Sequence, residues 1–387
     1  MWDHLKVIDG HVHYAWPISE DSLASALAAT GADAVCLAAL PVGFTKGGCA
    51  HPSTTLDCLA FKLRFPETAF VFGCLDCTAY GEKKRLGSYF ADYTKRLLEM
   101  GCDGIKMLEG KPTMRRSFPI PAFDDPVWEP YWTYAEEKQV PILMHVNDPE
   151  EFWNPDALPE VARLSGWGYG PDDINNEVQY TELFNLLKRH PNLNITFAHM
   201  FFFSGQLPRL SEWLDSFPHM RVDLTPGIEL IENMSRDIAA SRAFFLKYQD
   251  RIHFGTDIGG RTVGKGVTEL NMRESMLRAK YEHDFICGSA AIGVRADDDY
   301  LIGRPPFVLR GLDLPDEVQQ KILYGNFLDF VGCEKPWPVN VELCLKEIPR
   351  QRRMNRILAD KLGCDPDYSA LDWAKRILTD AKRSMEL

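Results

Sequence analysis

Short apolar runs alternate with amphipathic stretches along most of the chain. Eight runs have the length and composition of buried strands, and the stretches between them space their apolar residues as helices packed on a core do. The predicted strands are residues 5–8, 34–39, 69–74, 104–108, 141–145, 194–199, 220–224 and 251–255. The predicted helices are residues 20–29, 56–65, 83–100, 128–138, 177–189, 207–217 and 233–248, with 316–331 as a last helix.

Regular alternation of strands and helices is typical of parallel strands joined by crossover helices. The runs are apolar on both faces, as expected where helices cover both sides of the strands. Eight such units favour an α/β fold of the closed (β/α)8 or TIM-barrel type over an open doubly wound sheet. No Gly-x-Gly-x-x-Gly motif follows the first predicted strand, which argues against a dinucleotide-binding fold.

Three segments are too long for simple connections between elements, namely residues 41–55, 147–176 and 258–314. All three follow a strand and precede a helix, and barrel enzymes place their substrate loops on this side. We expect a barrel domain over residues 1–335. The charged, helical pattern that follows Pro336-Trp337-Pro338 predicts a helical extension over residues 336–387, packed on the barrel or on a partner subunit.

The composition of the chain excludes several classes of binding partner. The chain has 387 residues, of which 45% are hydrophobic and 25% charged, as in ordinary globular proteins. Its net charge of −12, without a basic stripe, argues against nucleic acid and anionic membranes as partners. We see no apolar run long enough to span a membrane and no secretory signal, so we expect a cytoplasmic protein. Its ten cysteines are then expected to be free thiols.

His11 and His13 follow the first predicted strand with one residue between them. Side chains on a strand alternate with period two, so the two imidazoles point to the same face. Such a pair can hold one zinc or similar ion through its ring nitrogens. The pair alone is weak evidence, because two histidines this close also arise by chance in a chain with ten.

Three more polar residues stand at the ends of predicted strands. His145 ends strand 141–145, His199 ends strand 194–199, and Asp257 follows strand 251–255. Barrel enzymes concentrate catalytic groups at the carboxyl ends of their strands. Four histidines and one aspartate at four strand ends are difficult to explain as accident, so the pattern predicts a metal-dependent active site.

These motifs together resemble the amidohydrolase superfamily. The nearest branch contains aminocarboxymuconate semialdehyde decarboxylase, resorcylate decarboxylases and related metal-dependent hydrolases. The resemblance covers about residues 7–329 and is carried by Asp9-Gly10-His11-Val12-His13, Gly104-Ile105-Lys106, His145, Ala198-His199, Gly255-Thr256-Asp257 and the run 321–326.

The resemblance implies a single divalent metal ion with His11, His13, His145 and Asp257 as its ligands. Zinc is the first expectation, with manganese and iron also compatible with imidazole and carboxylate ligands. His199 then lies close to the substrate as an acid/base group, and Asp257 is a second candidate to accept a proton.

Lys106 is a candidate substrate-binding residue in the fourth predicted strand. Two other roles remain open. In two-metal members of the superfamily a lysine at this strand is carboxylated and bridges the ions, with His145 and His199 on the second ion. A lysine that points outward, with its stem along the barrel surface, is the structural alternative.

Arg261 is the second candidate substrate-binding residue, because a guanidinium suits bidentate pairing with a substrate carboxylate. Arg115 and Arg116 could do the same, and a solvated loop charge is an open alternative for each of the three. Aromatic residues in the strand-end loops could line the pocket, although loop packing explains them equally well; they are Tyr14, Trp16, Phe44, Trp153 and Trp167.

Two reactions fit these residues. The leading hypothesis is a metal-dependent hydrolase, in which a metal-activated water attacks an amide, ester or lactone carbonyl. The alternative is non-oxidative decarboxylation of an aromatic or unsaturated carboxylic acid at the same site. A metal-stabilised binding protein without catalysis is a third reading. We expect a small-molecule substrate, with a carboxylate as one option, and a homodimer as a possible assembly.

Overall fold

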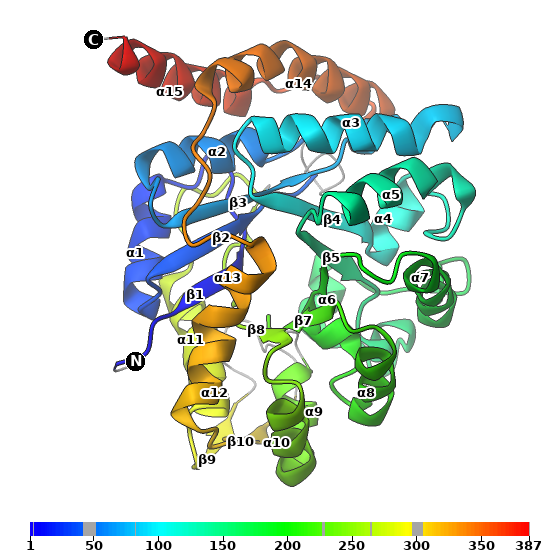
Figure 1. Cartoon of the computed structure of the whole chain (residues 1–387), viewed down its shortest axis with the longest axis vertical. Coiled ribbons are helices and arrows are strands. Elements are labelled where there is room, and N and C mark those ends of the chain that lie inside the picture. Colours follow the sequence, from blue (N-terminus) through cyan, green and yellow to red (C-terminus); the bar gives the residue numbers. More distant parts are fainter. Residues whose placement is uncertain are drawn as a thin grey trace.

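Eight parallel strands form the centre of the molecule and follow one another in chain order (Figure 1). The computed structural model describes residues 1–2, 4–41, 52–81, 83–226, 229–263, 265–295 and 305–386. The strands are β1 (Ile8–Val12), β2 (Ala34–Ala38), β3 (Ala69–Cys74), β4 (Gly104–Gly110), β5 (Ile142–Val146), β6 (Ile195–Phe197), β7 (Met220–Asp223) and β8 (Ile252–His253). The predicted (β/α)8 TIM barrel is therefore confirmed.

The barrel closes where the chain beyond β8 meets β1. The backbone N–H of Asp257 donates to the carbonyl of His11 at 2.8 Å, and the N–H of His13 donates to the carbonyl of Ile258 at 2.8 Å. These bonds fix the two segments that carry the first histidine pair and the aspartate against each other. The closing contacts thus position three of the predicted metal ligands.

Helices surround the strands as the apolar spacing predicts (Figure 1). They are α1 (Glu20–Thr30), α2 (Thr55–Arg64), α3 (Leu86–Glu99), α4 (Pro112–Ser117), α5 (Glu129–Glu137), α6 (Glu160–Ser165), α7 (Asn176–Arg189), α8 (Leu207–Ser216), α9 (Leu230–Arg236), α10 (Ile238–Lys247) and α11 (Met272–Ile286). The single helix predicted over 233–248 is broken at Asp237. The side chain of Asp237 accepts a hydrogen bond from the backbone N–H of Ala240 and caps α10, which is a typical role for aspartate.

The segment predicted as the last helix closes the amino-terminal end of the barrel. It consists of α12 (Asp316–Gln320), a π-helical turn (Lys321–Gly325) and α13 (Asn326–Val331). The ring of Phe327 lies 5.2 Å from that of Phe70, and Phe330 lies 5.7 Å from Phe72, both on β3. The helix that follows β8 and packs beside α1 is instead α11, inside the long segment 258–314.

That long segment also contains a hairpin of β9 (Ala291–Val294) and β10 (Phe307–Arg310). The segment 147–176 contains α6 and a 3-10 turn, Glu150–Trp153. Most of the predicted loop 41–55 lies outside the described residues. Both described insertions follow strands at the carboxyl end of the barrel, where the candidate site residues also lie.

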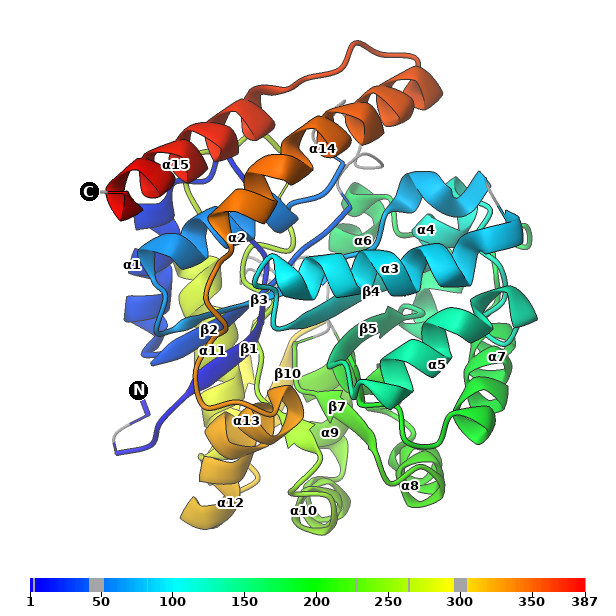
Figure 2. The same cartoon turned by 45° about the horizontal axis from the view of Figure 1, so that its top comes forward.

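The carboxyl-terminal extension forms two helices, α14 (Val341–Leu362) and α15 (Ser369–Met385), which lie across α2 and α3 (Figure 2). The Arg350 guanidinium lies 3.0 Å from Asp76 and 3.9 Å from the ring centre of Tyr93, and Glu347 pairs with Arg96 at 2.6 Å. The extension therefore packs on the barrel through buried polar contacts.

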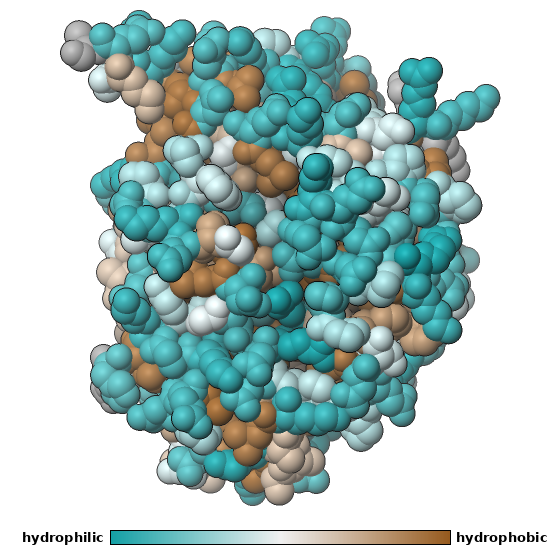
Figure 3. Space-filling model, in the orientation of Figure 1, coloured by the Kyte–Doolittle hydropathy of each residue, from teal (hydrophilic) through white to brown (hydrophobic). Residues whose placement is uncertain are grey.

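Polar and charged residues cover much of the face in Figure 3, and apolar residues occur there in separate patches. Among the described helices, none combines the length and the apolar composition that a bilayer crossing requires.

Eight cysteines of the described residues are free thiols. Cys364 is disulfide-bonded, so the expectation of free thiols throughout is wrong at that position.

Candidate metal centre and active site

His11, His13 and Asp257 meet at the carboxyl end of the barrel. One ligand atom from each lies within 4.8 Å of the others, and His13 Nε2 lies 3.1 Å from Asp257 Oδ1. The pairing of β1 with β2 shifts register between Asp9 and Val12, next to the histidine pair. Two imidazoles and one carboxylate are suitable donors for a divalent transition metal ion, so the residues present fit the predicted metal.

Neighbouring groups fix the rings of this histidine pair. His13 Nδ1 lies 2.6 Å from the carbonyl oxygen of Ala38, which leaves Nε2 directed at Asp257. His11 Nδ1 lies 2.8 Å from Asp223 Oδ2 and 2.9 Å from Thr225 Oγ1. Metal-binding histidines commonly use the second ring nitrogen in this way, because the contact sets the tautomer and orients the ring.

Lys106 points into the barrel and is almost completely buried. Its Nζ lies 2.9 Å from His11 Nε2, and it lines the same cavity as His13 and Asp257. The alternative of a lysine on the outer surface is therefore wrong. Burial lowers the pKa of Lys106 to about 8, because no solvent stabilises its charged form.

His145 and His199 form a second pair across the cavity. His199 Nε2 lies 3.2 Å from His145 Nδ1, while His145 Nε2 lies 2.8 Å from the carbonyl of Asn147 and 3.5 Å from Asp148 Oδ1. His145 is not part of the close set of donors formed by His11, His13 and Asp257 in the described residues. The structure thus places all five predicted residues at the carboxyl end of the barrel, which we call the mouth, but divides them into two groups.

Burial shapes the charge of this second pair. Desolvation, together with the charge of Lys111, lowers the pKa of His145 to about 4. Desolvation also lowers the pKa of His199, and the neighbouring His145 adds to the effect. Both rings are therefore neutral near pH 7, and a neutral imidazole is the form that binds a metal or accepts a proton.

Left-handed backbone conformations concentrate at these strand ends. The four consecutive residues His199–Phe202 have φ between 52° and 58°, Asp257 has φ 56°, and Asn147, after β5, has φ 67°. A left-handed conformation costs a non-glycine residue about 1–2 kcal/mol. Such strain persists where the surrounding contacts hold it, and it clusters at functional sites. Here it occurs at the ends of the strands that carry His145, His199 and Asp257.

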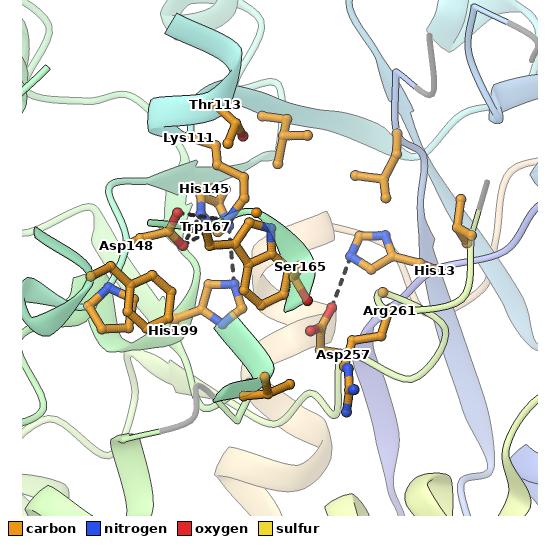
Figure 4. A pocket seen from close by; sticks show the side chains of 18 of the residues that line it. His13, Lys111, Thr113, His145, Asp148, Ser165, Trp167, His199, Asp257 and Arg261 are labelled. Carbon is orange, nitrogen blue, oxygen red and sulfur yellow. Dashed lines mark hydrogen bonds and ion pairs between the residues drawn. The ribbon is translucent and has the colours of Figure 1, made fainter. Parts of the chain in front are cut away.

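A cavity of about 410 Å³ opens above these residues. In Figure 4, His13 and Asp257 lie on one side, His145, Asp148 and His199 on the other, and Trp167 is drawn between the two groups. Apart from histidines, the charged side chains in the lining are mostly cations in a chain of net charge −12: Lys106, Lys111, Arg116, Arg261, Lys265 and Arg278, against Asp148 and Asp257. Phe152, Phe202 and Trp167 supply aromatic surface.

The predicted arginines have different positions. Arg261 lines the cavity and lies 3.6 Å from Glu274. Arg116 also lines it and pairs with Asp173 at 2.6 Å. Arg115 pairs with Glu182 at 2.7 Å and is not among the lining residues. Of the five aromatic residues suggested by the sequence, Trp167 lines the cavity, Tyr14, Trp16 and Trp153 do not, and Phe44 lies outside the described residues.

Sequence reasoning missed several residues of the site. Asp223 ends β7, so the rule that selected the other strand ends could also have found it. Lys111 and Asp148 pair at 2.7 Å on the cavity wall, and the Tyr169 hydroxyl donates to the same carboxylate. Arg278 lies on α11, 21 positions beyond Asp257, and no local pattern connects the two.

This chain resembles a known protein family and several solved structures. A family model described as amidohydrolase matches residues 8–332. The uncharacterized TIM-barrel protein Bb4693 from Bordetella bronchiseptica is 13% identical, with 85% of this chain and 100% of that chain covered and a TM-score of 0.53. A putative amidohydrolase from Staphylococcus aureus is 15% identical, with coverages of 85% and 100% and a TM-score of 0.51.

A third solved structure, 2,6-dihydroxybenzoate decarboxylase in complex with 2,6-dihydroxybenzoate, is 14% identical, with coverages of 85% and 99% and a TM-score of 0.50. At these identities the three structures support the fold alone. The search of curated proteins found no match. The family model spans most of the sequence, and the chain therefore belongs to the amidohydrolase family.

Proposed function

We propose that this protein is a metal-dependent hydrolase that cleaves an amide, ester or lactone of a small molecule. One observation carries the proposal, namely the convergence of His11, His13 and Asp257 donor atoms beside a cavity that His199 also lines. A buried cluster of this kind, open to a pocket of substrate size, is the arrangement that metal-assisted hydrolysis requires.

His11, His13 and Asp257 would hold the ion, with His145 as the candidate fourth ligand. Zinc is our first choice, and manganese and iron suit the same donors. When bound, a divalent ion polarises a substrate carbonyl and lowers the pKa of a water molecule toward neutrality.

The protein's own residues supply the proton transfers and the orientation of the substrate. Burial favours the protonated form of Asp257, but the neighbouring His13 and the positive charge of Arg278 outweigh it and lower the carboxyl pKa. Asp257 is therefore ionised, which is the form that binds a cation. Ionisation is also required for its second proposed role as proton acceptor, in which its low pKa makes it a weak base. His199 is neutral and borders the cavity, which suits it to take up a proton from the attacking water and then deliver it to the leaving group.

Cationic side chains outnumber carboxylates in the lining even when Asp173 and Glu274, which pair with Arg116 and Arg261 from outside it, are included, and this supports an anionic substrate. Lys106 and Arg261 are the first candidates to contact its carboxylate, as the sequence predicts, and Arg116 borders the same space. Benzoate and benzamide, which have similar size but different charge, test this point as competitive inhibitors. We expect benzoate to bind the more tightly, and equal affinities would contradict an anionic substrate.

The decisive experiment for the hydrolase is metal removal and restoration. Purified protein is analysed for bound metals, treated with a chelator, and returned to zinc, manganese or iron before each is assayed on panels of lactones, amides and esters. We expect activity to disappear with the metal and to return with one of the three ions. A protein that carries no divalent metal, and that none of them activates, would exclude this function.

Non-oxidative decarboxylation of an aromatic carboxylic acid is the second candidate. The observation that favours it is the combination of Phe152, Phe202 and Trp167 with cationic side chains around one cavity. Release of CO₂ from a panel of aromatic acids would support this reaction. Turnover of lactones or amides without any CO₂ release would exclude it. A cytoplasmic location and a homodimer remain predictions from the sequence.

A further inference from the structure

We propose that Arg278 is a positioning residue that makes Asp257 offer a single carboxylate oxygen to the metal ion. The inference rests on the proposed function, because it concerns how the predicted metal centre is held. It assigns a role to α11, which belongs to the long insertion after β8 and contributes none of the predicted ligands.

The two oxygens of Asp257 face different partners. Oδ1 lies 3.1 Å from His13 Nε2, on the side of the candidate ligands. Oδ2 lies 3.6 Å from Nη1 of Arg278. At this distance the contact is an ion pair rather than a hydrogen bond, and its attraction favours the orientation in which Oδ2 stays beside the guanidinium. The geometry thus favours binding of the ion by Oδ1 alone.

Hydrogen bonds to the backbone and to a neighbouring carboxylate hold the guanidinium of Arg278 in place. Its Nη1 donates to the carbonyl oxygen of Thr256 at 3.1 Å, so one guanidinium holds the side chain of Asp257 and the backbone just before it. Nε and Nη2 donate to Glu274 Oε1 at 3.1 and 2.9 Å. The side chain is 4% exposed. A planar group bound by several acceptors at once has little freedom to move.

The loop beyond Asp257 restricts the carboxylate further. A Cβ atom at Gly260 would collide with Oδ1 and with Cγ of Asp257, so the backbone at this glycine packs directly against the carboxylate. Asp257 also has a left-handed backbone, with φ 56°. Its side chain is therefore held between Gly260, His13 and Arg278 rather than free to choose among rotamers.

This restraint has a chemical consequence at the metal centre. Catalytic zinc sites typically have three protein ligands and keep a position open for water or substrate. If Oδ2 were released, it would compete for that open position and raise the coordination number. Residues that orient metal ligands typically change metal affinity or activity by about 10–100-fold when they are replaced. Arg278 would thus preserve the reactive position without touching the ion.

Cobalt substitution tests the proposal without any assay of activity. The metal-free protein is loaded with Co²⁺, whose visible absorption bands weaken as the coordination number rises. We compare the wild type with Arg278→Met and with Lys280→Met, a matched control that removes a cation from the same helix. Lys280 is half exposed and pairs with Asp284, on the outer side of α11.

We expect weaker bands for Arg278→Met and an altered Co²⁺ affinity, while Lys280→Met matches the wild type. Arg278→Ala should recover the wild-type spectrum when guanidinium ions are added at non-denaturing concentration, but not with sodium at equal ionic strength. A spectrum of Arg278→Met that superimposes on that of the wild type would overturn the proposal.

Glu274→Gln gives an independent measurement if the Arg278 variants do not fold. It removes the anion that fixes the guanidinium and should weaken the cobalt bands in the same direction but less. An unchanged spectrum in this folded variant would contradict the role of Arg278. Failure of the wild-type protein to bind cobalt at all would instead reject the proposed metal centre, so the two failures are distinguishable.

Discussion

The same eight strands end in two different environments, an apolar cluster at the amino-terminal end of the barrel and a polar cavity at the carboxyl end. At the amino-terminal end, Phe327 and Phe330 from α13 pack against Phe70 and Phe72 in a small apolar cluster. At the carboxyl end, buried histidines, carboxylates and cations surround a cavity, and the backbone adopts left-handed conformations. Most left-handed residues lie at the carboxyl end beside the cavity, whereas the amino-terminal end combines its apolar cluster with a buried ion pair of Lys62 and Asp103 at 2.6 Å. Strain therefore concentrates at the end that carries the candidate site, although buried polar groups occur at both ends.

His253 marks the boundary between these ends. It is buried on β8, its ring lies 5.0 Å from that of Phe330, and its Nε2 lies 3.1 Å from Thr196 Oγ1. Burial lowers its pKa to about 3, so it is a neutral interior group.

The largest expected effect comes from removing the histidine pair of the mouth. In His11→Ala/His13→Ala we expect metal binding and activity to be lost, because two of the candidate ligands are absent. Circular dichroism should still show a folded barrel, since the apolar end is intact. His253→Asn is the control and should keep its metal. A double variant that still binds stoichiometric metal would mean that the centre lies elsewhere.

His199→Ala separates chemistry from metal binding within the mouth. General acid/base groups typically contribute about 10²–10⁴-fold to the rate, so we expect kcat to fall by such a factor. Metal content, measured by elemental analysis, should remain that of the wild type, because His199 is not among the proposed ligands. If kcat is unchanged, His199 has no catalytic role; if the metal is lost, it belongs with the ligands.

The opposite end is tested by Phe330→Ala. Truncation of a buried phenylalanine typically lowers the free energy of unfolding by about 3–5 kcal/mol, from lost apolar contact and a remaining cavity. We expect a loss of this size in urea unfolding, with metal affinity and KM as in the wild type. An equally large effect of this variant on metal affinity would show that the two ends are not independent.

The sequence could predict the barrel because its evidence is local. Alternating elements and strand-end positions locate His11, His13, His145, His199 and Asp257 without knowledge of tertiary contacts. The pairing of His145 with His199, rather than with the three close donors, depends on how β5 and β6 lie beside each other. The contact of Arg278 with Asp257 and the closure by α13 arise between distant segments, and no periodicity encodes them.

The smallest expected effect concerns a buried acid near the mouth but outside the site. Glu109 belongs to β4, is 1% exposed, and is absent from the cavity lining. The Tyr80 hydroxyl donates to its Oε1 at 2.8 Å, while Oε2 has no hydrogen-bond partner among the described residues. Burial raises the pKa of Glu109 to about 7 from 4.5. The folded protein therefore keeps this proton more tightly than the unfolded chain does.

It follows that wild-type stability should fall as the pH rises from about 4.5 to 7, because the unfolded chain ionises first. Glu109→Gln keeps an acceptor for Tyr80 and removes the titration. We expect the free energy of unfolding of this variant, relative to that of the wild type, to rise by on the order of 2 kcal/mol from pH 5 to pH 8. Urea unfolding at both pH values measures this difference. An equal effect of the substitution at both would mean that the carboxylate is stabilised in the fold, and that buried charge at this end is tolerated beyond the candidate site.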